Sequence, residues 1–166
     1  SVLLGGIDEL TELKHELVTR LSKAQKESKT YYGQGEGSAF FSISAVPSGV
    51  KLDTLILSPN SKHEDINDYL LKHLASGEKT LILTGKSGGN GDEAYKPADE
   101  IIGTTATLNY KKYCGDYPTS CAFATWLASE LLQQTVVPEE FSRPEHVLIY
   151  HAYPDRAHTL IHLSVC

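Results

Sequence analysis

The sequence predicts an α/β fold, and an internal echo in the middle of the chain is the main reason. Thr54–Ser58 and Thr80–Thr84 are near copies, each a short apolar run typical of a buried strand. Between them, apolar residues recur at helical spacing, at Ile66, Leu70, Leu71 and Leu74. A buried strand, a crossover helix and a second buried strand predict a right-handed βαβ unit in a parallel sheet.

Strand and helix patterns also alternate before this unit. An apolar strand over residues 1–4 runs into Gly5-Gly6, and Asp8 is placed to cap a helix whose apolar face carries Leu10, Leu13, Leu17 and Leu21. Glycines at 33, 35 and 37 then lead into a strand over Ser38–Ser44. Because a strand and not a helix follows these glycines, the dinucleotide-binding fingerprint is not met. An isolated opening strand needs neighbours, so we expect an upstream part to be missing.

A glycine-rich loop follows the second echo strand, at Gly85–Asp92. It fails as a phosphate loop because the required glycine position is occupied by Thr80. Gly85-Lys86-Ser87-Gly88-Gly89 does match a nucleophile elbow, with Asp116 and His158 following in hydrolase order. An elbow must run directly into a helix, whereas this segment continues into further glycines and Pro97. A serine hydrolase on Ser87 is therefore an alternative function.

A polar loop ending in Gly115-Asp116 precedes a helix that we expect from Pro118 to about Gln134, after a short strand at Thr104–Leu108. The first turns of this helix contain mostly small side chains. Helix N-termini offer free amide groups, so a carbonyl oxygen or an anion is one expected ligand. A capped helix packed tightly in the core explains the same residues.

The chain ends in an expected antiparallel hairpin, His146–Tyr153 and His158–Val165, turning at Pro154–Arg156. Alternation puts His158 and Leu160 on one face, with Thr159 and Ile161 on the other. This hairpin contains three candidate metal ligands, His151, His158 and His162. No acidic or thiolate partner stands at a fixed spacing, so we predict half-buried strand histidines and no metal.

Composition narrows the class of protein. The chain has 166 residues, 40% hydrophobic and 22% charged, with a net charge of -6, as in an ordinary globular domain. Clustered Lys and Arg for a nucleic-acid groove are not seen, and no apolar run reaches the roughly 18 residues of a membrane span. The chain has three cysteines, Cys114, Cys121 and Cys166. They do not have the paired spacing of a zinc site, and three is not the even number expected of a disulfide framework. These features predict one cytoplasmic domain, residues 1–166, without nucleic-acid or membrane partners.

Taken in order, five segments resemble the β-ketoacyl-acyl-carrier-protein synthases of the thiolase superfamily. Val2–Glu9 is similar to a strand ending in Gly-Gly-Val-Asp-Glu, and Gly35–Phe40 to the Gly-Glu-Gly-Ala strand. Thr84–Asp92 stands at the His-Gly-Thr-Gly-Thr loop, and Lys111–Ala122 at the Lys-x-x-x-Gly-His-Thr segment. Tyr150–Ala157, which contains Tyr153, stands at the Phe-Gly-Phe-Gly-Gly turn. The resemblance spans this whole chain but only the later part of such an enzyme.

The resemblance implies a thiolase-like layered α/β fold with mixed sheets that lacks its usual N-terminal part. It implies an acyl carrier protein and an acyl thioester as partners, a homo- or heterodimer, and no cofactor. The family's two histidines are replaced by Thr84 and Asp116, while its lysine is retained as Lys111. Its cysteine nucleophile falls outside this sequence, and Cys114 does not fit that place. Lys111 and Asp116 are the candidate catalytic residues, with Thr84, Cys114 and Tyr153 lining the pocket.

These departures favour a catalytically silent or partial subunit, similar to the chain-length factors, which pair with an active partner and shape an acyl tunnel. Fatty acid or polyketide-type biosynthesis is the implied setting. A divergent condensing enzyme with its nucleophile in a missing upstream part is the second hypothesis. In that case Lys111 and Asp116 would do altered acid–base work. The Ser87 hydrolase is the third.

Overall fold

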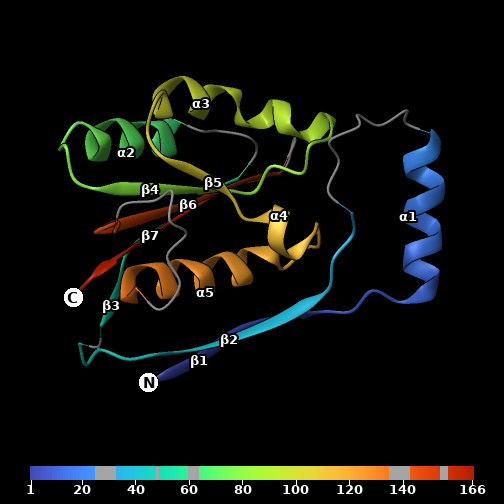
Figure 1. Ribbon diagram of the computed structural model, residues 1–166, viewed down its shortest axis with the longest axis horizontal. Coiled ribbons are helices and arrows are strands. Elements are labelled where there is room, and N and C mark those ends of the chain that lie inside the picture. Colours follow the sequence, from blue (N-terminus) through green and yellow to red (C-terminus); the bar gives the residue numbers. More distant parts are fainter. Residues whose placement is uncertain (25–32, 48, 60–63, 135–142, 154–156) are drawn as a thin grey trace.

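The computed structural model describes residues 1–24, 33–47, 49–59, 64–134, 143–153 and 157–166. Its centre is a five-stranded mixed sheet with helices on both faces (Figure 1), so the predicted α/β layered fold is confirmed. The strands follow the order β3 (Val50–Pro59), β7 (Ala157–Val165), β6 (His146–Tyr153), β4 (Thr80–Thr84) and β5 (Thr107–Asn109). Within the described ranges, no helix combines the length and the apolar character needed to cross a bilayer.

Helices α2 (Glu64–Leu74) and α3 (Lys96–Ile102) cover one face of the sheet, with the short 3-10 helix η1 (Asn90–Tyr95) leading into α3. Helix α5 (Ser120–Gln133) covers the other, preceded by the single turn α4 (Lys111–Cys114). Strand β6 contributes to both cores, because Ile149 packs with Leu131 of α5 while Leu148 packs with Ile66 of α2. Burial on both faces explains why this strand reads as a continuous apolar run.

The predicted βαβ unit is only partly correct. Strands β3 and β4 run in the same direction, but β7 and β6 lie between them, so the two echo strands are not neighbours. The hairpin from the end of the chain takes the intervening places. Strand β3 is therefore an edge strand, and Leu55 and Leu57 are 61% and 67% exposed, against the expectation of a buried strand. An internal echo identifies two strands but carries no information on which strands pair.

The final hairpin is confirmed, and it occupies the middle of the sheet. Its faces follow the predicted alternation: Leu160 joins the core under α2 and α3, and Ile161 packs on the side of α5. Helix α5 begins at Ser120, two residues after the expected start at Pro118, and ends at Gln133. The short strand expected at Thr104–Leu108 is β5, shifted toward Asn109. The expected turn at Pro154–Arg156 and the segment after Gln134 lie outside the described residues.

The N-terminal strand–helix–strand pattern is also confirmed, but it forms a separate layer. Strands β1 (Val2–Asp8) and β2 (Gly37–Ile43) make a two-stranded antiparallel sheet beyond α5, and α1 (Glu12–Ala24) stands to one side (Figure 1). The apolar face predicted for α1 is not packed against the described core, since Leu13 and Leu17 are 73% and 57% exposed.

Candidate functional site

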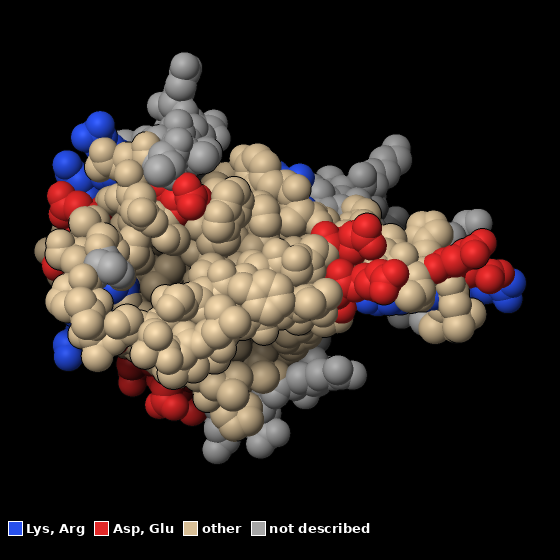
Figure 2. All heavy atoms as spheres, turned by 90° about the horizontal axis from the view of Figure 1, so that it is seen from below, with Lys and Arg blue, Asp and Glu red and all other residues tan. Residues whose placement is uncertain are grey.

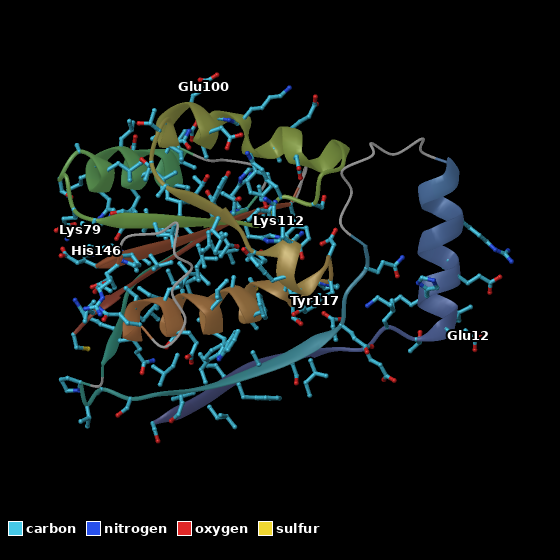
Figure 3. All side chains as sticks on the ribbon, viewed as in Figure 1. Glu12, Lys79, Glu100, Lys112, Tyr117 and His146 are labelled. Carbon is cyan, nitrogen blue, oxygen red and sulfur yellow. The ribbon has the colours of Figure 1, made fainter. Side chains whose placement is uncertain are left out.

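Lys111 and Asp116, the two candidate catalytic residues, form an ion pair. Lys111 Nζ donates to Asp116 Oδ1 at 2.6 Å, with the lysine side chain 7% exposed and the carboxylate 30% exposed. The turn that brings them together contains Gly115, whose φ of +77° favours glycine. Lys112 and Tyr117, which adjoin the pair in sequence, are labelled near α4 in Figure 3.

The alternate glycines of the N-terminal half support this turn. Gly35 N donates to the carbonyl of Asp116 at 3.2 Å, and Asp116 N donates to the carbonyl of Gly33 at 3.0 Å. A Cβ atom on Gly35 would lie 2.0 Å from the carbonyl oxygen of Cys114. Glycine is required here because the two backbones touch, which gives the motif a packing role.

Thr84 lies at the end of β4 and is 5% exposed, paired with Asn109 on β5 and Tyr150 on β6. The next residue, Gly85, abuts a buried hydrogen bond of 2.6 Å between Tyr110 Oη and His151 Nδ1. Burial, followed by the charge of nearby Lys111, lowers the pKa of His151 to about 3. This imidazole is neutral at neutral pH, and the sequence pointed to it only as a candidate metal ligand.

The start of α5 is capped from another layer of the molecule. Asp8, expected to cap the first helix, is the last residue of β1, and its Oδ2 accepts from Thr119 N at 2.8 Å and Thr119 Oγ1 at 2.9 Å. Thr11 instead accepts from Lys14 N near the start of α1. The anion expected at the start of α5 is thus the protein's own carboxylate. Tyr153 donates its hydroxyl to the carbonyl of Pro118 at 3.0 Å.

Neither thiol in this region has the environment of a nucleophile. Burial raises the pKa of the half-buried Cys114 to about 11, and burial also raises the pKa of Cys121 in the first turn of α5. A nucleophilic thiol needs a lowered pKa, because the thiolate is the reactive form. The raised pKa values of Cys114 and Cys121 therefore shift both thiols away from the reactive form.

The three residues of the hydrolase hypothesis each have another partner. Asp92 Oδ1 accepts from Ser87 N at 2.8 Å and lies 3.5 Å from its hydroxyl, while Asp116 is paired with Lys111. His158 Nδ1 shares a 2.6 Å hydrogen bond with Tyr150. A 3-10 turn, starting at residue 90, follows the loop. This arrangement gives the hypothesis no support.

A groove of about 780 Å³ separates the β1–β2 sheet from the main body. Apolar residues of both sheets and of α5 contribute to its lining, among them Leu4, Phe41, Ile43, Leu52, Ala122 and Leu163. The hydrogen bond from Thr119 N to Asp8 Oδ2, at the start of α5, joins the main body to the β1–β2 sheet. The groove is thus an apolar space next to, but distinct from, the Lys111–Asp116 pair.

Comparisons with known proteins identify the fold. No protein-family model matches the chain, and no curated protein matches it. The structure is similar to a chain of AntDE:AntF (apo), described as a type II PKS acyl-carrier protein in complex with its ketosynthase bound to the hexaketide. The TM-score is 0.67 at 17% identity, covering 99% of this chain and 50% of that chain. The chain therefore has a layered α/β fold that spans half the length of its structural neighbour.

Proposed function

We propose that this chain is a β-ketoacyl-acyl-carrier-protein synthase-like subunit that takes part in fatty acid or polyketide-type chain condensation without being catalytically complete. The fold similarity to a chain of a type II PKS complex supports the class. The observation that carries the proposal is the Lys111–Asp116 ion pair, which stands where the resemblance puts the lysine and the second histidine.

The chemistry of the pair explains why the subunit would be silent. Condensation by decarboxylation requires hydrogen-bond donors aimed at a developing enolate oxygen. A carboxylate that is ion-paired with an ammonium group accepts hydrogen bonds and has no proton to donate. The Asp116 carboxylate also neutralises the positive charge of Lys111, which would otherwise stabilise an anion. Thr84, buried at the end of β4, offers a hydroxyl in place of an imidazole. The raised pKa values of Cys114 and Cys121 also argue against either of these two thiols as the nucleophile.

The exposed β1–β2 sheet supports a protein partner. Large apolar side chains of this sheet are half or more exposed: Val2, Leu3, Leu4, Ile7 and Phe40. Figure 2 shows that a broad part of the face seen from this side carries no charged side chains. A two-stranded sheet is marginally stable alone in water, and its edges remain available for pairing. We propose that strands of another polypeptide segment, equivalent to the unmatched half of the structural neighbour, complete this sheet and cover the groove.

The second candidate is a divergent condensing enzyme whose nucleophile comes from that covering segment. The retained and buried Lys111 is the observation that favours it, since a buried ammonium near a helix start is suited to bind a thioester carbonyl or carboxylate. In this case the site would be completed only in the assembled protein, and Asp116 would orient Lys111.

Mass spectrometry after incubation with an acyl-carrier thioester tests the proposal. The chain is mixed with the acyl-loaded carrier protein, and covalent adducts are mapped by peptide; binding of the carrier is followed in parallel by fluorescence anisotropy, with unloaded carrier as the control. We expect carrier binding without an acyl adduct on this chain. The Lys111→Met/Asp116→Asn double variant should behave the same way, because it removes the ion pair without leaving an unpaired charge.

Each other outcome selects a different function. An adduct on a cysteine of the covering segment in the assembled protein, or release of CO2 from a malonyl-loaded carrier, contradicts the silent subunit and favours the condensing enzyme. An adduct on Ser87 favours the hydrolase. If the carrier does not bind and no adduct forms, the proposal of a ketosynthase-type role loses its support.

A further inference from the structure

Three histidines meet at the end of the sheet opposite to the Lys111–Asp116 pair. His73 lies in the last turn of α2, His146 opens β6, and His162 lies in β7. One ring nitrogen from each lies within 4.8 Å of the others. Figure 3 shows His146 at one end of the molecule, well away from Lys112 and Tyr117. The cluster is not the set considered from the sequence, because His151 and His158 are bound to tyrosines elsewhere.

Hydroxyl groups behind two of the rings fix their tautomers. The Tyr69 hydroxyl donates to Thr54 Oγ1 at 3.0 Å, so it accepts from His162 Nδ1 at 2.7 Å. This leaves a lone pair on His162 Nε2. In the same way, Thr80 Oγ1 donates to the carbonyl of residue 78 at 3.2 Å and accepts from His73 Nε2 at 3.0 Å. The lone pair of His73 is then on Nδ1, which lies 3.6 Å from Glu78 Oε2. Outer partners of this kind orient imidazole ligands in metal sites.

His146 completes the inner set of nitrogens. Its Nδ1 lies 2.9 Å from His162 Nε2 and, in the metal-free protein, donates its proton there. Its Nε2 lies 3.4 Å from Glu78 Oε2. If an ion took the lone pair of Nδ1, the proton would move to Nε2 and face the Glu78 carboxylate. A carboxylate–histidine–metal arrangement results without loss of a proton from the ring.

Asp53 supplies a carboxylate oxygen next to the cluster. Its Oδ2 is buried, accepts no hydrogen bond from any residue in the described ranges, and lies 3.8 Å from His162 Nε2. The other oxygen of this carboxylate, Oδ1, pairs with Lys51 Nζ at 2.5 Å, whereas Oδ2 is left as a buried acceptor that a cation would satisfy. This orphaned oxygen is an observation independent of the three rings and points to the same ligand.

The spacing of the ligand atoms suits a metal ion. Zn–N bonds of about 2.0–2.1 Å put tetrahedral ligand atoms roughly 3.3 Å apart. The distances of 2.9 Å and 3.8 Å given above lie on either side of this value.

We infer that His73, His146 and His162 bind one divalent ion of the zinc type, and that Asp53 Oδ2, which lies 3.8 Å from His162 Nε2 but outside the set of three rings, moves in as the fourth donor. Three imidazoles and one carboxylate are borderline ligands, which suit zinc better than magnesium or calcium. With this fourth donor the coordination shell would be closed, so the ion would be structural and would tie the end of α2 to β3, β6 and β7. The inference does not depend on the proposed function.

Zinc titration of the untagged, chelator-stripped chain tests this site. Calorimetry should give one ion per chain with micromolar or tighter affinity. Zinc at about 100 times its dissociation constant should raise the thermal midpoint by roughly 5–10 °C. Magnesium at the same concentration should not change it. The His146→Gln variant should lose the midpoint shift, whereas His15→Gln, which removes an exposed imidazole of α1, should keep it. Asp53→Asn should weaken zinc binding at least about tenfold.

Cobalt provides a measurement that does not depend on any variant folding. Bound to the wild-type chain, Co²⁺ should show the intense visible absorption of a tetrahedral site, and one equivalent of zinc should abolish it. Weak, octahedral-type absorption, zinc binding that His146→Gln leaves unchanged, or a midpoint that zinc does not move would each overturn the inference. If Asp53→Asn binds zinc as tightly as the wild type, the carboxylate is not the fourth donor.

Discussion

Replacing Gly35 by alanine tests whether the N-terminal layer is built against the Lys111–Asp116 turn. The added Cβ would lie 2.0 Å from the carbonyl oxygen of Cys114 and 3.0 Å from the ring of Tyr117. Real Cβ atoms do not approach closer than 3.0 Å, so the two backbones must separate by at least 1.0 Å (3.0 minus 2.0). Gly33 in the same segment has no atom of the described residues within 4 Å of its Cβ position and is the matched control.

The expected cost follows from the contacts that this separation breaks. Two backbone hydrogen bonds join the segments, Gly35 N to Asp116 O at 3.2 Å and Asp116 N to Gly33 O at 3.0 Å. At about 1 kcal/mol each, their loss lowers the free energy of unfolding by about 2 kcal/mol. For a domain of this size that is a drop of roughly 4–8 °C in the thermal midpoint.

Thermal and urea unfolding of Gly35→Ala, Gly33→Ala and the wild-type chain measure this effect. We expect Gly33→Ala to stay within about 0.5 kcal/mol of the wild type. In Gly35→Ala, peptide-mapped alkylation of Cys114 should also become faster, because its loop opens. Equal midpoints for the two variants would refute the claim that the glycine segment is fixed by direct backbone contact with the turn.

Three further predictions concern the same region. Tyr110→Phe removes the partner of a buried imidazole nitrogen and should cost about 1–3 kcal/mol in urea unfolding, while Tyr113→Phe, at an exposed position, should be neutral. Contacts with the first turn of α5 and with a lysine overcome the opposing effect of burial and lower the pKa of Asp8 below 3.8. This carboxylate therefore stabilises the fold above that pH and loses its effect as the pH falls through its folded pKa, so unfolding of Asp8→Asn should depend less on pH below about 4. With a pKa of about 11, Cys114 should alkylate much more slowly at pH 8 than the exposed Cys166, and its rate should keep rising to pH 11; a rate like that of Cys166 at pH 8 would contradict burial of the thiol.

Local patterns predicted the elements well because they report on short-range chemistry. The alternation in the final hairpin and the apolar spacing in α2 gave the correct strands, faces and helix. The resemblance singled out Lys111 and Asp116 five positions apart, and a glycine-containing turn is enough to bring such close neighbours together. Burial of these elements in two cores then followed from their apolar faces.

Long-range pairings were not predictable in the same way. Asp8 was assigned to the nearest helix, whereas it caps a helix 111 residues further on. The echo strands were expected to pair, whereas the terminal hairpin lies between them. The histidines that meet come from α2, β6 and β7, and neither their spacing nor their neighbours in the sequence marks them as a set.

The sequence by itself thus determined the α/β class, the order of most elements and the polar loop before α5, because propensity, periodicity and turn chemistry act over a few residues. Only the tertiary structure decided strand adjacency, the cap on α5, the contact between the glycine segment and the turn, and the histidine cluster. These features depend on which surfaces pack together once the chain is compact. The residues around a side chain in the sequence do not specify which distant residue it will contact.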